Sequence, residues 1–481
     1  DARAPRISRL VVIDIPTGDA APVTQKPYPI PQRYQEAVRK EIQKLLDAGL
    51  IEPGIGNWAS PALLTVKKDS TTDELKIKIV VDYRVLNSCT QLDAGGLGNQ
   101  EDILRNLGGR QKYMGIADLA GGFYEFCLSK SSLVKSAFIL PTNMGGTLYQ
   151  WVVAPYGLAR NPSSFSRGVM FALQGMAELN IGVMGSSRGG VHSWVDDIVF
   201  HADSLDGYMD LFERILERLC WAGLSLKASK CELLREQMEV LGFIAHPDGL
   251  KMNPKKVGNI QKVVTPSNPQ EVLTFLGMVN FYRRFVPRMG LLAKPLTDML
   301  KKGGKFDPNA CEQACQAIKD YLGSADVLSV PIFDDPLAEF VMCTDASDVA
   351  VGGVLMQWQW PHASDAGKFP PEGTPMRGGK GGDPLNQSWR LAAGWELKTI
   401  GFYSKTLDET QSKYNVFDKE GGAILLCMRH WADMVTGFPV TVYTDSVVAA
   451  SMLTKYKGTT RLQRWGLELM NFLPHLKIGY R

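Results

Sequence analysis

The sequence lacks an uninterrupted apolar run of about 18 residues, the length that a transmembrane helix needs, and its first residues lack the pattern of a signal peptide. It also lacks a strong charge of either sign, because 53 Lys and Arg residues nearly balance 50 Asp and Glu residues. This balance argues against a uniformly basic protein, but it permits a basic channel that acidic surfaces offset elsewhere. We therefore expect a soluble intracellular protein with no membrane partner.

Cysteine and histidine are sparse and scattered. Of the eight Cys residues only Cys311 and Cys315 stand close together, at helical spacing, and no cluster among the six His residues completes a zinc site. Scattered cysteines in a chain of this size indicate reduced thiols in a reducing compartment.

The chain is too long for one hydrophobic core. Its 481 residues include 45% hydrophobic and 21% charged residues, which is ordinary for globular proteins. We therefore expect roughly two to four domains.

Two adjacent carboxylates, Asp196 and Asp197, stand between short apolar runs in the stretch 191–200 (VHSWVDDIVF). This pattern predicts a β-hairpin whose tight turn carries both residues. Side chains alternate on a strand, but a turn relaxes this rule and leaves a carboxylate free to meet another from elsewhere. Such a cluster would bind a hard cation such as Mg²⁺; the alternative is a plain polar turn.

Asp118 is the natural third carboxylate. It ends an apolar run that begins at Tyr113, and Gly121 and Gly122 follow it closely. Glycines there permit a close approach between the backbone and a ligand. Phe123 comes next, and the alternative interpretation of its ring is simple core packing.

Three cations accompany two predicted strands, 62–68 and 75–82. Lys67, Lys68 and Arg84 could bind a triphosphate, since guanidinium and ammonium groups pair with phosphate oxygens. Solvated strand edges are an equally good interpretation of these residues.

Strands and helices are mixed over residues 34–250 without strict alternation, which favours an α+β fold over a Rossmann sheet. We expect helices at 34–48, 162–176 and 205–222, strands at 224–231 and 240–244, an irregular segment at 88–111 and a flexible insertion at 181–190.

The remainder of the chain is first helical and then strand-rich. Helices are predicted at 254–263, 269–285 and 308–322, and a Gly- and Pro-rich insertion at 361–388. Asp345 and Asp445 each follow a β-type run, and Glu420 lies near the start of a predicted helix at 418–431. These three residues form a second candidate carboxylate cluster.

Many short motifs follow one another along the chain from about residue 30 to its end. They are Trp58–Pro61, Val81–Asn87, Asp118–Phe123, Pro155–Leu158 with Asn161–Phe165, Val195–Asp197, Lys230–Glu232, Leu241–Phe243, Phe275–Phe285, Lys294–Asp298 and Thr344–Ser347. In this order the motifs resemble those of a known family, the reverse transcriptase–ribonuclease H region of gypsy-type long-terminal-repeat retrotransposon Pol polyproteins.

The resemblance implies a right-hand polymerase of fingers, palm and thumb, followed by a ribonuclease H-like α/β domain. The implied division is an extended segment at 1–33, fingers and palm at 34–245, thumb and connecting helices at 246–325, and the ribonuclease H-like domain at 336–481.

The resemblance also implies roles for single residues. Asp118, Asp196 and Asp197 would bind two Mg²⁺ ions, or Mn²⁺, and Leu241, Gly242 and Phe243 would grip the primer end. Phe123 would exclude a ribose 2′-hydroxyl. The other nucleotide-binding residues would be Lys67, Lys68, Arg84, Tyr156 and Lys230, and Asp345, Glu420 and Asp445 would hold the metals of the ribonuclease H.

The sequence departs from the family in several places. Trp194 replaces the usual Tyr before the Asp pair, and Ser446 replaces the usual His after Asp445. Gly421 and Gly422 follow Glu420, and two glycines in a helix cost about 2 kcal/mol relative to alanine. The sequence ends before the segment with the family's fourth carboxylate, so we expect an impaired ribonuclease H.

Two functions remain open from the sequence. The first is an RNA-directed DNA polymerase that acts on an RNA template, a DNA primer and deoxynucleoside triphosphates, with a weak ribonuclease H for RNA–DNA hybrids, in the cytoplasm, the nucleus or a retroelement particle. The second is a decayed or co-opted element copy that binds nucleic acid or serves as a structural subunit without catalysis.

Overall fold

The computed structural model describes residues 8–68, 75–93, 100–107, 112–176, 179–181, 187–333, 335, 337–359, 390, 394–451 and 459–480. The chain forms two compact units, residues 1–103 with 111–236, and residues 104–110 with 237–481. Within the described ranges, no helix combines the length and apolarity that a membrane crossing requires.

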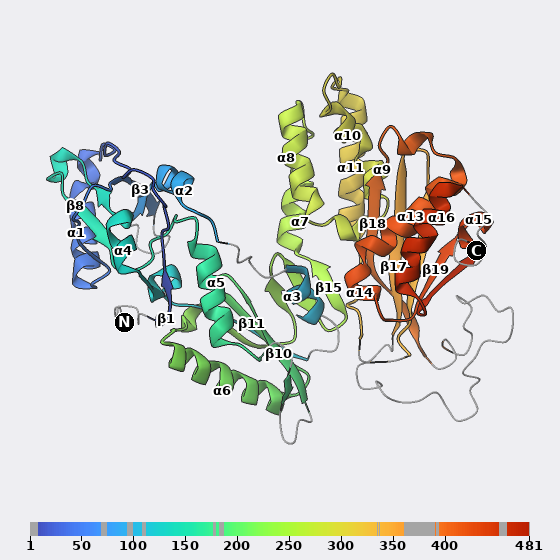
Figure 1. Ribbon diagram of the computed structural model, residues 1–481, viewed down its shortest axis with the longest axis horizontal. Helices are drawn as coiled ribbons and strands as arrows, with labels where there is room; N and C mark the ends of the chain where they lie inside the picture. The colour runs from blue at the N-terminus through green and yellow to red at the C-terminus, as the bar shows by residue number, and fades with distance from the viewer. Residues whose placement is uncertain are drawn as a thin grey trace. The chain divides into compact units, whose positions relative to one another are not determined.

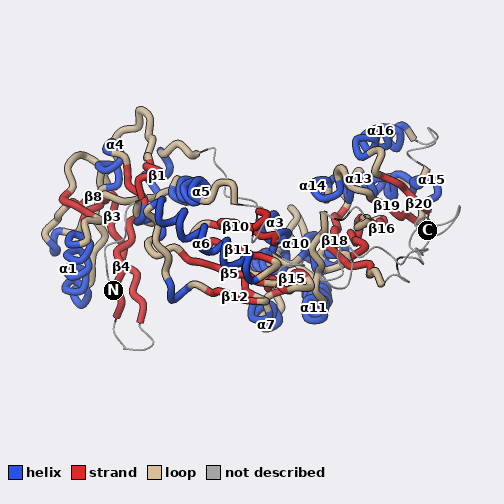
Figure 2. The backbone as a smooth tube through the Cα atoms, turned by 90° about the horizontal axis from the view of Figure 1, so that it is seen from below, coloured by secondary structure: helices blue, strands red, loops and turns tan. Residues whose placement is uncertain are grey.

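A five-stranded sheet and helix α1 (Gln32–Asp47) make up one part of the first unit. The sheet order is β2 (Ile51–Pro53), β8 (Leu148–Trp151), β7 (Phe138–Ile139), β3 (Ser60–Lys68) and β4 (Leu75–Val81). Figure 2 shows α1 beside these strands. The predicted helix at 34–48 is confirmed, because α1 buries Val38, Ile42 and Leu45 as one apolar stripe.

A second sheet of the first unit carries the Asp residues. Its order is β12 (Glu232–Arg235), β5 (Tyr113–Asp118), β11 (Asp197–Ala202), β10 (Ser187–Trp194) and β9 (Leu179–Ile181). Helices α5 (Asn161–Ala172) and α6 (Leu205–Ala222) pack against it (Figure 1). Phe200 of β11 stacks on Tyr208 of α6, with ring centroids 5.2 Å apart. The face toward α6 is therefore core, which leaves the other face for Asp118 and Asp197.

The first unit also contains β1 (Ser8–Ile13), which runs parallel to β6 (Phe126–Leu128), and the short helices α2 (Arg84–Cys89) and α4 (Lys130–Leu133). Helix α3 (Gln100–Leu107) crosses from the first unit into the second.

Three local predictions for this part of the chain are wrong. Residues 88–111 are not all irregular, because they include α3. Residues 187–190 of the predicted insertion belong to β10. Gly189 and Gly190 pair with β11, since a backbone ladder needs no side chains there. The predicted strand at 224–231 is replaced by a 3₁₀ turn at Ala228–Lys230.

The second unit begins with a small sheet of β13 (Met238–Val240), β14 (Phe243–His246) and β15 (Gly249–Met252). The predicted strand at 240–244 is wrong, because Leu241 and Gly242 form the turn between β13 and β14 with φ values of +50° and +84°. Helices α7 (Pro254–Gln261), α8 (Pro269–Asn280), α9 (Met289–Leu292), α10 (Lys294–Met299) and α11 (Pro308–Ser324) follow. Asn253, Asn268 and Asp307 cap three of them directly before a Pro, which is a strong helix-start signal.

The last sheet has the order β18 (Glu396–Thr406), β17 (Ala350–Gln359), β16 (Phe340–Ala346), β19 (Val440–Thr444) and β20 (Leu476–Tyr480). Strands β16, β19 and β20 are parallel to one another, whereas β17 and β18 are antiparallel to their neighbours. Helix α13 (Val416–His430) packs on β16 and β17, and α14 (Ala432–Val435), α15 (Val447–Ala450) and α16 (Thr460–Leu469) complete the unit (Figure 1). The predicted insertion at 361–388 lies outside the described residues.

Candidate active sites

The hairpin of β10 and β11 turns through two residues, Val195 and Asp196, while Trp194 and Asp197 pair across its end. Val195 has a φ of +51°, a left-handed conformation that disfavours a β-branched side chain and costs about 1–3 kcal/mol. The backbone N–H of Leu119 donates to the carbonyl of Asp196 at 3.2 Å. The strained turn is therefore tied to the segment that follows Asp118.

Asp118 and Asp197 occupy directly opposite positions on β5 and β11. Opposite residues of an antiparallel pair have Cα atoms about 4.5–5.5 Å apart and side chains on the same face. The backbone N–H of Lys227 donates to the carbonyl of Asp118 at 2.8 Å, which fixes the end of β5. The register of two strands thus brings together carboxylates that are distant in the sequence.

The electrostatics of this cluster favour a bound cation. Burial, followed by the negative charge of Asp118, raises the pKa of both Asp196 and Asp197. The Lys230 ammonium lies 2.6 Å from Asp118 Oδ2 and partly compensates this charge. Asp196 Oδ1 is buried and has no hydrogen-bond partner among the described residues. An all-oxygen set with an unpartnered carboxylate oxygen fits a hard divalent cation.

Gly122 and two aromatic rings adjoin the cluster. A Cβ atom added at Gly122, whose φ is +52°, would lie 2.8 Å from Tyr156 Oη and 3.8 Å from Asp196 Oδ2. The Phe123 ring meets Tyr156 and the buried Phe165 edge-on, with centroids 5.3 and 5.2 Å apart. The half-buried Phe123 is therefore packed on one side, and its role as a gate against ribose stays a prediction.

The predicted triphosphate cations are only partly described. Arg84 donates two hydrogen bonds to the buried Asp82, from Nε to Oδ1 at 2.9 Å and from Nη2 to Oδ2 at 2.7 Å. These bonds hold the pKa of Asp82 well below its usual range although burial opposes them. The exposed Arg84 guanidinium is thereby held in one place. The side chains of Lys67 and Lys68, at the end of β3, lie outside the described residues.

The predicted primer grip, Leu241, Gly242 and Phe243, belongs to the second unit. Tyr282 donates from its hydroxyl to the Gly242 carbonyl at 2.7 Å, and the buried Phe243 ring stacks on Phe281 with centroids 4.9 Å apart. The structure thus gives this turn a rigid anchor in the core of its unit. A contact with a primer stays a prediction.

One residue near the first cluster was missed by the sequence analysis. Glu125 is wholly buried, accepts a hydrogen bond from the Ser225 backbone N–H at 3.0 Å, and has its pKa raised to about 7 by burial. Ser225 also accepts from the Ala120 N–H at 2.7 Å, so Glu125 braces the loop after Asp118. The only signal was an acid within an apolar run, Phe123–Phe126.

The second cluster is tighter. Asp345 of β16, Glu420 of α13 and Asp445, directly after β19, each place one carboxylate oxygen within 4.8 Å of the other two. No other acidic, His or Cys trio in the described part of the chain meets that distance, so the first cluster is more open.

Glu420 is the buried member of this trio. Its Oε1 accepts from the Ala346 N–H at 3.1 Å, while Oε2 is buried without a partner among the described residues. Burial, followed by the charge of Asp445, raises its pKa to about 7. A divalent cation would relieve both the repulsion and the unpartnered oxygen, so this donor set also fits.

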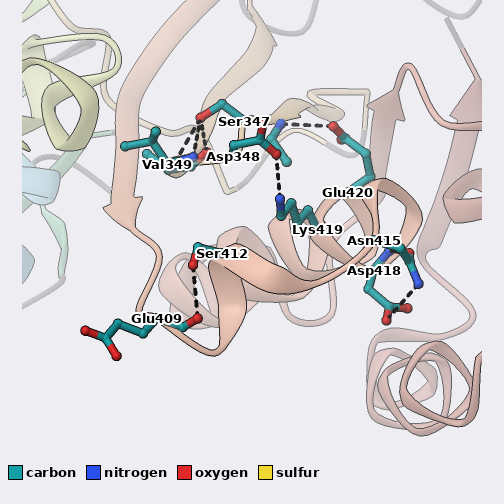
Figure 3. A network of polar contacts seen from close by, with 11 residues as sticks. Ser347, Asp348, Val349, Glu409, Ser412, Asn415, Asp418, Lys419 and Glu420 are labelled. Carbon is teal, nitrogen blue, oxygen red and sulfur yellow. Dashed lines mark hydrogen bonds and ion pairs between the residues drawn. The ribbon is translucent and has the colours of Figure 1, made fainter.

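Neighbours of Glu420 on α13 fix the helix in place. Figure 3 shows the nearly buried Lys419 reaching Asp348, whose Oδ1 lies 2.6 Å from the Lys419 Nζ. The buried Asp418 accepts from Thr459 at 2.5 Å and from Arg461 at 2.7 Å, which links α13 to the start of α16. These residues position Glu420 against β16.

The departures from the family have local structural explanations. Helix α13 runs unbroken through Gly421 and Gly422, and a Cβ atom at Gly422 would lie 3.4 Å from the Trp465 ring of α16. Ser446 caps α15 by accepting from the Ala449 N–H at 3.2 Å. Neither departure disrupts the described fold.

Family models match most of the two units. Residues 66–245 match the reverse transcriptase (RNA-dependent DNA polymerase) model. Residues 308–364 and 385–472 match two models of the RNase H-like domain found in reverse transcriptase. Asp118, Asp196 and Asp197 fall in the first match, and the second trio falls in the other two.

Similar proteins are Pol polyproteins of transposons. The chain is 29% identical to the retrovirus-related Pol polyprotein from transposon 297 of Drosophila melanogaster, over 96% of this chain and 38% of that protein. It is 28% identical to the transposon Tf2-3 polyprotein of Schizosaccharomyces pombe, over 94% of this chain and 30% of that protein. The chain thus spans less than half of each of these relatives.

Solved structures share the fold at low sequence identity. A foamy viral protease–reverse transcriptase, in its dRH form with double-stranded DNA, superposes with a TM-score of 0.76 at 23% identity, covering 99% of this chain and 74% of that one. The foamy viral enzyme with an RNA/DNA hybrid gives 0.69 at 22% identity, covering 99% and 57%. These matches confirm a right-hand polymerase fold followed by an RNase H-like domain.

Families of both kinds generally use divalent metals, in keeping with the two carboxylate clusters. The chain therefore carries a reverse transcriptase domain followed by an RNase H-like domain, the pair found in the Pol polyproteins of gypsy-type retrotransposons.

Proposed function

We propose that this chain is an RNA-directed DNA polymerase that extends a DNA primer on an RNA or DNA template from deoxynucleoside triphosphates. We propose that its second unit cuts the RNA strand of RNA–DNA hybrids. The main support is the meeting of Asp118 with the Asp196–Asp197 hairpin inside the region that matches reverse transcriptase. The named complexes of foamy viral relatives, with double-stranded DNA and with an RNA/DNA hybrid, support nucleic-acid partners of these kinds.

Asp118, Asp196 and Asp197 would hold the catalytic cations, which we propose to be Mg²⁺ with Mn²⁺ as a substitute. Such cations activate the primer 3′-hydroxyl and neutralise the pyrophosphate that leaves. The protein contributes fixed carboxylates, because the strand register holds Asp118 and Asp197 and the strained turn holds Asp196. Preplaced ligands need little rearrangement when the nucleotide binds.

Cationic and aromatic side chains would hold the incoming nucleotide. Lys230 already lies beside Asp118. Once a divalent cation compensates the charge of that carboxylate, the Lys230 ammonium would be free to pair with the triphosphate. Arg84 is held by Asp82 with most of its guanidinium exposed. Phe123, packed on Phe165, would limit the volume below the sugar and so favour deoxyribose.

Asp345, Glu420 and Asp445 would hold the cations of the ribonuclease H. Such cations would activate water for attack on the RNA phosphate. Lys419 and Asp418 keep Glu420 in register with Asp345. The 2′-hydroxyl and the A-form-like groove would mark the RNA strand of the hybrid.

Primer extension on an RNA template tests the polymerase proposal. The wild type should extend the primer with Mg²⁺, and Asp196→Asn should lose this activity because it removes one carboxylate from the cluster. Asp210→Asn is a matched control, since Asp210 pairs with Arg214 of the same helix, α6, at 3.0 Å. Equal inertness of the wild type and Asp196→Asn with both Mg²⁺ and Mn²⁺ would reject the proposal.

A further inference from the structure

An arginine from outside the RNase H-like sheet reaches the second carboxylate cluster. Arg288 Nη2 lies 3.4 Å from Asp345 Oδ2, although Arg288 belongs to the turn before α9. Both partners are in the same compact unit. A cation is therefore already present at the edge of the trio Asp345, Glu420 and Asp445.

Specific contacts hold this turn on the sheet. The Gly290 N–H donates to Ser404 Oγ at 3.1 Å, and Arg283 donates to the Ser404 carbonyl at 2.8 Å. A Cβ atom at Gly290 would lie only 2.8 Å from Ser404 Oγ, so glycine permits this close approach.

The strand register connects Ser404 with Asp345. Asp345 pairs with Gly352 on β17, and Gly352 pairs with Ser404 on β18, so the three residues form one row on one face of the sheet. Gly352 carries no side chain in the middle of that row. The turn anchored at Ser404 can thus bring Arg288 across β17 to Asp345.

Fold stability does not explain this arginine. The side chains of Arg288 and Asp345 are 70% and 62% exposed, and ion pairs in such solvent contribute little to folding. The backbone of Arg288 is left-handed, with φ +54°, a conformation that disfavours residues other than glycine, asparagine and aspartate. A strained residue with a weak partner beside a carboxylate trio points to binding rather than folding.

The chemistry of the partner follows from the guanidinium group. Its planar fork pairs with the oxygens of a phosphate in a bidentate manner. When Asp345 is engaged by a divalent cation, Arg288 loses this partner and its donors become available to another anion. The anion that a ribonuclease H site brings there is the sugar–phosphate backbone of its substrate.

We propose that Arg288 is a phosphate-binding residue of the ribonuclease H site, contributed by the turn before α9, and that it contacts the backbone of the RNA/DNA hybrid. This inference rests on the proposed ribonuclease H function. It adds a substrate contact from the helical part of the second unit to a site built otherwise from β16, α13 and β19.

The test uses Arg288→Asn, because asparagine tolerates the left-handed backbone and the variant should fold at least as well as the wild type. Arg288→Lys keeps the charge but loses the fork. Arg429→Gln is the matched control, since Arg429 is an exposed arginine of α13 paired with Glu468 at 2.6 Å. Thermal unfolding of each variant checks its fold.

Two readouts separate binding from chemistry. Binding of a labelled RNA/DNA hybrid is measured in a Glu420→Gln background over a range of salt concentrations. There Arg288→Asn should weaken binding about 3- to 10-fold and reduce the slope of log K against log salt by about 0.7–0.9, as for one lost phosphate contact. In the otherwise wild-type protein, Arg288→Asn should raise KM for the hybrid with a small change in kcat. Arg288→Lys should be intermediate, and Arg429→Gln unchanged.

A folded Arg288→Asn variant that matches Arg429→Gln in hybrid affinity, salt slope and KM would overturn the inference while leaving the ribonuclease H proposal intact. A wild-type protein that neither binds nor cuts the hybrid would instead reject that proposal, and the inference with it.

Discussion

The two carboxylate clusters have the same chemistry but are held in different ways. In the first, strand register and a strained turn bring three Asp residues together, and Lys230 of the same unit compensates Asp118. In the second, a helix adds a buried Glu to two exposed Asp residues, and the three meet within 4.8 Å. A cation adjoins each cluster, Lys230 at Asp118 and Arg288 at Asp345. The second cluster differs in its buried Glu420, whose pKa is raised to about 7 by burial and by the charge of Asp445.

This difference suggests how each cluster should respond to change. The first should depend mainly on ligand number and backbone geometry, because its charge is shared over three Asp residues and one Lys. The second should depend strongly on pH and on metal, because Glu420 must give up a proton to bind a cation.

The largest effect is a separation of the two activities. Asp118→Asn should lower primer extension about 10³-fold and leave hybrid cutting intact, while Asp445→Asn should do the reverse, since each removes a proposed metal ligand worth several kcal/mol. Both activities are measured on the same preparations, with the exposed Asp248→Asn as a control. Loss of both activities in either variant would show that the clusters are not independent.

Glu125 should make the first unit sensitive to pH, although it is not one of the three proposed metal ligands. The pKa of Glu125 is raised in the folded protein from 4.5 to about 7. The protonated side chain therefore contributes its full stability to the fold below pH about 4.5, and this contribution is lost as the pH rises through 7. Glu125→Gln should therefore raise the free energy of unfolding at pH 8 by about 2–3 kcal/mol and much less at pH 4.5. Denaturant unfolding of the wild type and of Glu125→Gln at the two pH values measures this difference. An equal gain in the free energy of unfolding at both pH values would contradict the raised pKa of Glu125.

Metal binding at the second cluster should weaken in acid. Because the pKa of Glu420 is raised to about 7, protons compete with Mg²⁺ below that pH, and the affinity should fall by up to about 10-fold for each lower pH unit. Mg²⁺ should accordingly raise the Tm of the second unit more at pH 8 than at pH 6, and Glu420→Gln should remove this dependence. A Mg²⁺-induced Tm shift that is the same at both pH values would show that Glu420 is not a ligand.

Relief of strain in the hairpin should give the smallest effect on stability. Val195→Gly places glycine at φ +51° and should stabilise the first unit by about 1 kcal/mol, because glycine adopts this conformation readily. Primer extension should nevertheless fall, since the turn would hold Asp196 less firmly. Val195→Ala, which keeps the strain, is the control for loss of the side chain. If Val195→Gly leaves stability unchanged, then the turn stores no strain.

Local patterns predicted much of the first site. The apolar runs around Asp196 and Asp197 indicated the hairpin, and the run that ends at Asp118 indicated the strand beside it, because short apolar runs bounded by turn residues are a local signal of strands. The register that sets Asp118 opposite Asp197 is a long-range pairing, and no local pattern determines it. The meeting of Asp118 with Asp196 and Asp197 could therefore be expected only from the chemistry of metal-binding carboxylates and from the family resemblance.

The errors arose where local composition and tertiary pairing disagree. Glycines at 189 and 190 suggested a loop, but the ladder to β11 forms through the backbone alone. The sequence predicts a strand through Leu241, yet a turn places this residue at φ +50°. The Arg288–Asp345 pair was missed because it depends on how α9 docks on β18, which no motif records.

Diffraction from crystals grown with Mn²⁺, a primer–template and a nucleotide that cannot be incorporated would test directly whether three Asp residues of the first unit hold the catalytic cations. We expect anomalous scattering peaks bounded by the carboxylates of Asp118, Asp196 and Asp197. An ordered primer end and nucleotide with no peak among these three side chains at saturating Mn²⁺ would contradict it.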